Sequence, residues 1–291
     1  MKSSTMVVAP IIAALVKSED ILGKDRKWGA VNSLQTLFLK KYFSSKNELS
    51  KFSSQELRSW VSLMASELNE ILAKEGFDIR LEDFGGGEFG VVSILDVLVE
   101  WMTKGTKASI WNNGNYYPGV RMTSDFSVFR SKYHSWPIAA VYTKSGDYVY
   151  MTVAGEESDG FNLLERIERI GSGLREDSGY EYVEFPMIDL NHEVDIKWLR
   201  GMQTNQVDTW SLYQISQALQ QTKFKMNEFG ARVKSAVAIG VFLSTVAPPP
   251  PKALIIDKPF YLWIERDGVS APIIAARFDL DVWKDPGSLS M

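Results

Sequence analysis

The last third of the chain constrains the fold most, because strand-like segments there flank a stretch that cannot stay in a sheet. Residues 223–227 alternate charged and apolar side chains, which is the period of a half-exposed strand. Residues 228–230 interrupt this alternation, and it resumes from Ala231. Prolines occupy positions 248–251 and cannot donate ladder hydrogen bonds, so this stretch is predicted to leave the sheet as an exposed, polyproline-like segment.

Two apolar runs follow the prolines and are predicted to form a buried β-hairpin. They cover residues 258–264 and 271–278, and Arg266-Asp267-Gly268 lies between them. An Asp-Gly pair between apolar runs is a strong hairpin signal. The chain is therefore expected to hold an exposed loop, at about 231–252, between a strand and this hairpin. Loops of that length in compact domains usually have a function.

Composition excludes several classes of protein. The hydrophobic fraction is 45% and the charged fraction 23%, as in an ordinary soluble globular chain. The net charge of -4 provides no basic field, so no nucleic-acid partner is expected. Because the chain has no cysteine, it can form no disulfide and has no thiol nucleophile. A zinc–thiolate site is excluded for the same reason.

The apolar run near the start, residues 6–16, is too short to cross a bilayer, and no membrane partner is expected. Lys2 in front of it is typical of a signal peptide, but residues 17–20 are Lys-Ser-Glu-Asp, with no clean small-residue cleavage site. We favour a buried strand that runs into a helix. The lack of cysteines and N-glycosylation sequons favours an intracellular over a secreted protein and leaves the compartment open.

The residues needed for common catalytic sites are missing. The chain has two histidines, His134 and His192, and neither lies in a recognisable pattern. A Ser-His-Asp triad would have to use one of them. The G-x-S-x-G, H-E-x-x-H and phosphate-loop motifs are absent. We therefore expect no catalytic residue and a protein that is not an enzyme.

The rest of the chain mixes helices and strands. Residues 53–56 have the spacing of a helix capping box, and apolar residues then recur every three or four positions. This pattern predicts an amphipathic helix over 54–73. The sequence further predicts a strand over 91–102, a hairpin of 136–142 with 148–153, and a helix over 159–170.

The C-terminal hairpin resembles the signature of the serpin family. In that signature a basic residue, Pro and Phe open an apolar strand, here Lys258-Pro259-Phe260, and the second strand ends near an Arg, here Arg277-Phe278. Residues 227–230 fall where serpins have an acidic stretch and a hinge glycine. Other segments resemble serpin elements in the same order along the chain. Residues 7–10 resemble the early buried strand and helix start, residues 33–42 the second strand of the main sheet, and residues 57–61 the helix that lies across that sheet. Residues 97–100 with 104–106 resemble the central strand of that sheet, and residues 185–188 resemble a later strand.

This resemblance implies an α+β fold with a large, mostly antiparallel main sheet, smaller sheets, covering helices and a reactive-centre-type loop near the C-terminus. It implies one serpin-like domain over 1–291, a monomer, without the first helix and two of the early helices of the family. The alternative is a generic α+β domain in which the hairpin is a coincidence.

The mechanism implied by the resemblance is suicide-substrate inhibition, which needs neither a metal nor any other cofactor. A protease attacks the loop, an acyl-enzyme forms, and the freed loop inserts as a strand into a metastable sheet. Insertion requires small or apolar side chains on one face of the hinge, and the matching residues are Gly230, Ala231, Val233, Ser235 and Val237.

The resemblance leaves the bond that the protease attacks open. Counting forward from the hinge places it at Ser244-Thr245, with Leu243 as a further candidate beside it, whereas counting back from Lys258 places it at Pro248-Pro249. Apolar residues around 242–246 suit a chymotrypsin-like or elastase-like serine protease.

The polar network that helps a serpin sheet to open, called the shutter, differs in this chain. The family uses two serines, an asparagine and a histidine, and the matching residues here are Ala9, Ile12, Glu100 and Gln220. Glu100 and Gln220 together are a candidate substitute network, and the bulky hinge residues Val233 and Lys234 predict slow insertion.

Three functions therefore stay open. The first, which we slightly favour, is a non-inhibitory serpin-like protein that binds a protein partner. The second is a protease inhibitor, and the third is an unrelated α+β binding protein.

Overall fold

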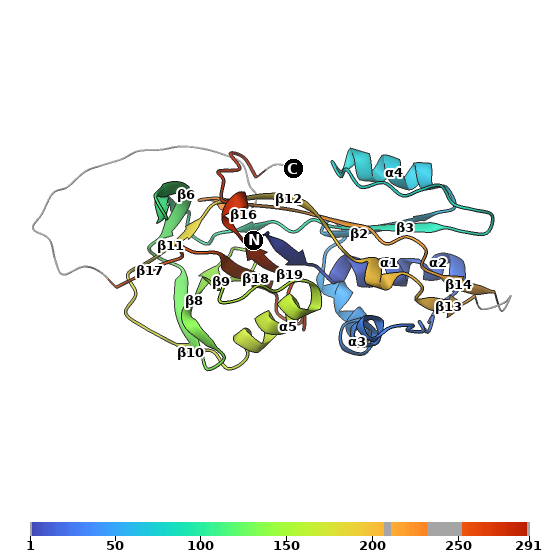
Figure 1. The fold of residues 1–291 in the computed structure, drawn as a ribbon, viewed down its shortest axis with the longest axis horizontal. Helices are drawn as coiled ribbons and strands as arrows, with labels where there is room; N and C mark the ends of the chain where they lie inside the picture. Colours follow the sequence, from blue (N-terminus) through green and yellow to red (C-terminus); the bar gives the residue numbers. More distant parts are fainter. Residues whose placement is uncertain (1, 207–210, 232–251, 290–291) are drawn as a thin grey trace, which may run out of the picture.

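The computed structural model describes residues 2–206, 211–231 and 252–289. The largest sheet within these residues has seven antiparallel strands, in the order β1-β19-β18-β9-β8-β7-β10 (Figure 1). The predicted C-terminal hairpin is confirmed and lies inside this sheet. The strands are β1 (Ser4–Met6), β7 (Phe126–Ser131), β8 (His134–Tyr142), β9 (Tyr148–Val153), β10 (Arg175–Glu176), β18 (Phe260–Glu265) and β19 (Ile274–Phe278).

The hairpin β18–β19 is buried on both faces, which explains why its sequence is continuously apolar rather than alternating. Phe260 and Leu262 point into the larger core, whereas Tyr261 and Trp263 point into a second core on the other face. Helix α5 (Gly160–Gly171) covers that second face with Leu163, Leu164, Ile167 and Ile170. The predicted helix over 159–170 is therefore confirmed.

A four-stranded sheet, in the order β17-β11-β6-β5, lies next to the seven-stranded sheet. Strand β17 pairs in parallel with β11, and the other pairs are antiparallel. The Asn113-Gly114 turn joins β5 and β6, and both residues have positive φ, as this tight turn requires. The strands are β5 (Thr106–Asn112), β6 (Asn115–Met122), β11 (Tyr182–Pro186) and β17 (Ala253–Ile255).

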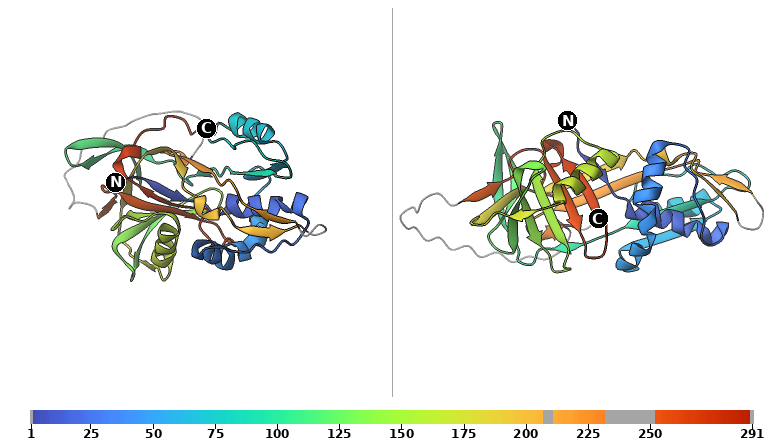
Figure 2. Two further views of the ribbon diagram at one scale, coloured as in Figure 1. Left: turned by 45° about the vertical axis from the view of Figure 1, so that its right-hand side comes forward. Right: turned by 90° about the horizontal axis from the view of Figure 1, so that it is seen from below.

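Two strand pairs complete the part of the fold that bears on function. One pair is β2 (Leu57–Ser62) with β3 (Gly90–Leu95), and the other is β12 (Ile188–Val194) with β15 (Gln220–Met226). Helix α1 (Ala9–Lys17) packs on one face of β2–β3, and α4 (Ala65–Lys74) covers the other face. Figure 2 shows that the helices of the N-terminal third gather at one end of the molecule, away from strands β7 to β10.

Shorter elements connect these layers. They are α2 (Glu19–Leu22), α3 (Ser33–Lys41), η1 (Phe43–Lys51), β4 (Val99–Glu100), η2 (Lys197–Leu199), β13 (Gln203–Asn205), β14 (Leu212–Gln214), β16 (Gly230–Ala231) and η3 (Leu280–Val282). In the described part of the chain, no helix is long and apolar enough to cross a membrane.

The predicted helix over 54–73 is wrong in its first half. The capping box forms, because the Ser53 N–H donates to Glu56 Oε2 at 2.8 Å and the Glu56 N–H donates to Ser53 Oγ at 3.2 Å. It closes a single turn, and strand β2 begins at Leu57. Pairing with β3 along all of β2 outweighs the local helical period, and helix α4 begins only at Ala65.

The strand expected over 33–42 is also wrong, and so is the helix expected over 57–61, which is strand β2. Residues 33–41 form helix α3, because Asn32 Oδ1 accepts a hydrogen bond from the Gln35 N–H at 2.9 Å and caps its N-terminus. The strand predicted over 91–102 is divided into β3 and β4. The predicted hairpin of 136–142 with 148–153 is confirmed as β8–β9, and the N-terminal strand that runs into a helix is confirmed as β1 and α1.

Candidate functional site: a groove between two strand edges

An apolar groove runs between β3 and β15 and contains a cavity of about 360 Å³. Ile11, Ala14 and Leu15 of α1 form its floor. The segment that leads from α4 to β3 forms its roof, with Phe77 and Leu81 among the lining residues. The groove is therefore enclosed above and below, and its two long sides are strands.

Each of these two strands has one edge without a partner strand in the part of the chain that the structure describes. Strand β3 pairs with β2, strand β15 pairs with β12, and no ladder joins β3 to β15. The backbone groups on the inner edges therefore face the groove. Unpaired strand edges of this kind are templates for another strand.

The chain reverses direction at the head of the groove. The Asn227 N–H donates to the Gly230 oxygen at 2.9 Å, and the Gly230 N–H donates to the Asn227 oxygen at 3.3 Å. After this turn, β16 pairs antiparallel with β4, with Gly230 opposite Glu100 and Ala231 opposite Val99. Strand β16 therefore lies between β4 and the end of β15. Ala231 is 5% exposed and lines the groove.

Gly230 is required at this turn. Its φ is +148°, and a Cβ atom on it would lie 2.3 Å from the Val99 oxygen. Buried Trp101 holds the same turn from the side, because its Nε1–H donates to the Asn227 oxygen at 3.0 Å and its backbone N–H donates to the Phe229 oxygen at 3.2 Å. The start of the predicted hinge is thus fixed against β4.

The four predicted shutter residues do not form one network. Ala9 and Ile12 are buried in α1. The Gln220 Nε2–H donates to the Val7 oxygen at 2.9 Å, whereas Glu100 forms an ion pair with Lys144 at 3.0 Å. Glu100 and Gln220, considered together as a substitute network, therefore have separate partners.

Several predicted site residues lie outside the described residues. Gly230 and Ala231 are at the head of the groove, as described above. The remaining hinge residues and all the scissile candidates belong to the undescribed segment: Val233, Ser235, Val237, Leu243, Ser244, Thr245, Pro248 and Pro249.

Sequence analysis missed the roof of the groove. Residues 77–82 alternate apolar and charged side chains, Phe-Asp-Ile-Arg-Leu-Glu, which is the period of an extended segment. This alternation was the feature of the sequence that could have indicated an extended segment here. It is not a strand in the structure, because its backbone bonds to side chains rather than to a neighbouring strand.

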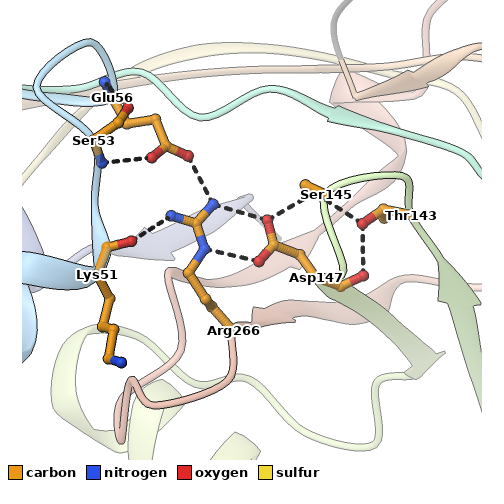
Figure 3. Close-up of polar contacts among 7 residues, drawn as sticks. All are labelled: Lys51, Ser53, Glu56, Thr143, Ser145, Asp147 and Arg266. Atoms are coloured by element: carbon orange, nitrogen blue, oxygen red, sulfur yellow. Dashed lines mark hydrogen bonds and ion pairs between the residues drawn. The ribbon is translucent and has the colours of Figure 1, made fainter.

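A second polar cluster surrounds Arg266, in the turn after β18 (Figure 3). Arg266 Nε and Nη2 donate to the two oxygens of Asp147, at 2.8 and 2.9 Å, and Nη2 also donates to Glu56 Oε1 at 2.7 Å. The hydrogen bond to Asp147 raises the pKa of Arg266. Both carboxylates are paired with the one guanidinium, so this cluster ties the start of β2 to the seven-stranded sheet.

The two histidines are on different sheet elements. His134 Nε2 lies 2.9 Å from Thr152 Oγ1 and 3.0 Å from the Val153 oxygen, and burial lowers its pKa. His192 is on β12, and burial lowers its pKa as well. Within the described ranges, no group of three or more potential metal ligands is present.

Comparisons with known proteins define the fold. No protein-family model and no curated protein matches the sequence. Solved structures do match: a highly specific serpin, Serpin48, from the insect Tenebrio molitor, is 13% identical with a TM-score of 0.61, over 100% of this chain and 92% of that one. A thyroxine-binding globulin complex with thyroxine is 11% identical with a TM-score of 0.55, over 98% and 94%. Mouse protein-Z dependent protease inhibitor is 12% identical with a TM-score of 0.52, over 95% and 90%.

These matches cover almost the whole chain, and the protein therefore has a serpin-like α+β fold, as the C-terminal hairpin suggested. The mouse protein is named as a protease inhibitor, whereas the globulin is named for binding thyroxine. The fold alone does not choose between these functions.

Proposed function

We propose that this protein inhibits a serine protease by taking up part of its own loop as a strand in the groove between β3 and β15. The observation that supports this proposal most strongly is the position of β16. The chain has already turned back at Asn227–Gly230, and Ala231 occupies the first position of such a strand, between β4 and β15.

The sequence after Ala231 suits this role. Ala231 is buried in the larger core with Val99 and Met226, so alternate residues in an extended continuation would be on that same, inward face. These residues are Val233, Ser235 and Val237, which are small or apolar. Arg232 and Lys234 would face the opposite side, where their charges can reach water.

The length of the groove favours one of the two candidate cleavage positions. Residues 90–100, from β3 to β4, span about 36 Å at roughly 3.3 Å per residue. A matching strand would run from Ala231 to about residue 241. The bonds next to Leu243, Ser244 and Thr245 would then lie just beyond the end of that strand, and we propose them, rather than Pro248-Pro249, as the site of attack by a chymotrypsin-like or elastase-like protease.

The second candidate function is a non-inhibitory protein that presents the loop to a protein partner. The observation that favours it is the apolar character of Ala9 and Ile12, which stand where the family has polar residues that help the sheet to open. In this alternative the loop is cut without being taken up.

Cleavage followed by thermal unfolding separates the two functions. The protein is incubated with elastase-like and chymotrypsin-like proteases, the cut is located by mass spectrometry, and the melting temperature is measured before and after. We expect a cut at 243–245, a rise in melting temperature of roughly ten degrees or more, and a protease complex that survives a denaturing gel.

Two variants sharpen the assignment. Ala231→Glu places a carboxylate in the apolar groove and is expected to abolish the rise in melting temperature without preventing the cut. Arg232→Glu, on the opposite face, is the matched control and is expected to keep the rise. A wild-type chain that is cut without any rise, and without a stable complex, would establish the non-inhibitory alternative.

A further inference from the structure

The roof of the groove is a tethered segment, residues 76–84, which we call the strap. The strap follows α4 and leads toward β3 (Figure 1). Its apolar side chains line the groove and pack against α4 and β3: Phe77, Ile79, Leu81 and Phe84. A strand in the groove would lie beneath these side chains.

Two glutamines hold the strap from the β15 side. Gln221 Oε1 accepts hydrogen bonds from the Asp78 N–H at 2.7 Å and the Ile79 N–H at 3.2 Å. Gln217 Oε1 accepts from the Glu82 N–H at 2.8 Å, and its Nε2–H donates to the Glu82 oxygen at 3.1 Å. The Lys223 ammonium also donates to the Gly76 oxygen.

One asparagine holds the strap from the β3 side. Asn69, on α4, accepts from the Leu81 N–H at 2.8 Å and donates to the Leu81 oxygen at 2.9 Å. Because α4 lies on β2–β3, the strap is tied to both sides of the groove. Its height above the groove floor is therefore fixed by hydrogen bonds at both edges.

The pairing at the head of the groove sets the register of a strand beneath the strap. Asn227 is opposite Gly230, so the same antiparallel register places Ala236 opposite Gln221 and, carried further, Gly240 opposite Gln217. On the other side, Ala231 is opposite Val99, and a continuation of this register would place Ala236 opposite Ile94 and Ala238 opposite Val92. Ile94 and Val92 are the β3 residues that pack against the strap.

Side-chain direction agrees with this register. Met226 and Phe224 of β15 are buried in the core below, so Gln221 and Lys223 face the roof, as their bonds to the strap require. Opposite residues of an antiparallel pair share a face. In a strand taken up with this register, residues 236, 238 and 240 would therefore face the strap, and all three are small: Ala, Ala and Gly.

We propose that the strap is a fixed roof that selects the strand taken up by the groove, admitting small side chains at positions 236, 238 and 240 and rejecting large ones. This inference rests on the proposed function and names the segment that determines which strand sequences the groove takes up. In the same register, the large residues Arg232 and Lys234 would lie on this face before the part of the groove that Gln221 and Gln217 close.

Uptake of synthetic peptides tests the inference without a protease. A fluorescent peptide with the sequence of residues 232–242 is added to the uncleaved full-length chain, and uptake is followed by anisotropy and by the melting temperature. Three peptides are compared: the natural sequence, one with Ala236→Phe, and one with Arg232→Phe as the matched control on the same face outside the strap.

We expect Ala236→Phe to slow uptake roughly tenfold or more, because an overpacked site typically raises a barrier by that amount, and Arg232→Phe to leave uptake within roughly threefold of the natural peptide. The chain variant Gln217→Ala with Gln221→Ala frees one edge of the strap. It is expected to restore most of the uptake of the Ala236→Phe peptide, and amide exchange at Asp78, Ile79 and Glu82 verifies that the strap has been released.

Each contrary outcome has a separate meaning. Equal uptake of the natural and Ala236→Phe peptides by the natural chain would overturn the inference and leave the proposed function intact. The inference would also be overturned if the Ala236→Phe peptide is taken up slowly both by the natural chain and by the Gln217→Ala, Gln221→Ala variant. The obstruction would then lie outside the strap. If no peptide is taken up by either chain, the proposed function itself fails, and the inference fails with it.

Discussion

Arg266 is predicted to be a large single contributor to stability. Its side chain is 14% exposed, and that of its partner Asp147 is 1% exposed. Replacing Arg266 by Met keeps most of the apolar stem but leaves the Asp147 carboxylate buried without a compensating charge. Breaking a buried pair in this way costs about 3–5 kcal/mol. The bond to Glu56, which is 24% exposed, adds less because water screens it.

Urea denaturation at neutral pH measures this cost. A loss of about 4 kcal/mol lowers the urea midpoint by roughly 1–2 M when the slope of unfolding free energy against urea is about 3 kcal/mol per M. The slope should not change, because the same surface is exposed on unfolding. Arg200→Met, at an exposed position, is the matched control and should leave the midpoint within the error of measurement.

A double variant separates the buried charge from lost packing. Arg266→Met with Asp147→Leu removes both charges, and we expect it to recover more than half of the loss. The reasoning is refuted if Arg266→Met costs less than about 1 kcal/mol, or if the double variant is as unstable as the single one.

Three further changes are predicted from the contacts described above. Gly230→Ala should lower the free energy of unfolding by about 2–3 kcal/mol, measured by urea denaturation, because its Cβ would meet the Val99 oxygen; an unchanged midpoint would show that β4 can yield. Trp101→Phe should cost about 1–2 kcal/mol by removing the donor to the Asn227 oxygen, and a neutral result would mean that water replaces that bond. Burial raises the pKa of Glu56, but the bonds from Arg266 and from the Ser53 N–H outweigh it and hold the pKa below 4.5. Its contribution should therefore be fully present above that pH and lost as the pH falls below it, and Glu56→Gln should flatten stability curves measured in that range.

The parts of the fold that local sequence patterns determine were predicted from the sequence. The hairpins β8–β9 and β18–β19 have turn residues between apolar runs, and α5 has a clear apolar stripe, so local geometry and burial indicate the same element. The proline-rich loop was predicted from the loss of ladder donors. It lies outside the described residues, and its exposure remains a prediction.

Elements that depend on distant partners were not predicted. Residues 57–62 have helical spacing, yet they form β2, because pairing with β3 satisfies six consecutive residues at once. The groove could not be foreseen either, since it exists only because β3 and β15, far apart in the sequence, stop short of pairing. The glutamines that hold the strap give no signal in a single sequence, because an isolated Gln is an ordinary surface residue.

The interior position of β18 and β19 has a consequence for any chain that has been cut between residues 232 and 251. The C-terminal piece includes Lys252, whose ammonium lies 2.9 Å from Asp177 Oδ1, and it supplies two interior strands of the seven-stranded sheet. Its departure would expose buried Phe260, Leu262 and Trp263, so the two pieces should stay together as one particle in native solution. The protein is therefore a natural candidate for fragment complementation: two separately produced pieces, divided within the loop, should assemble into the cleaved form without ever having been one chain.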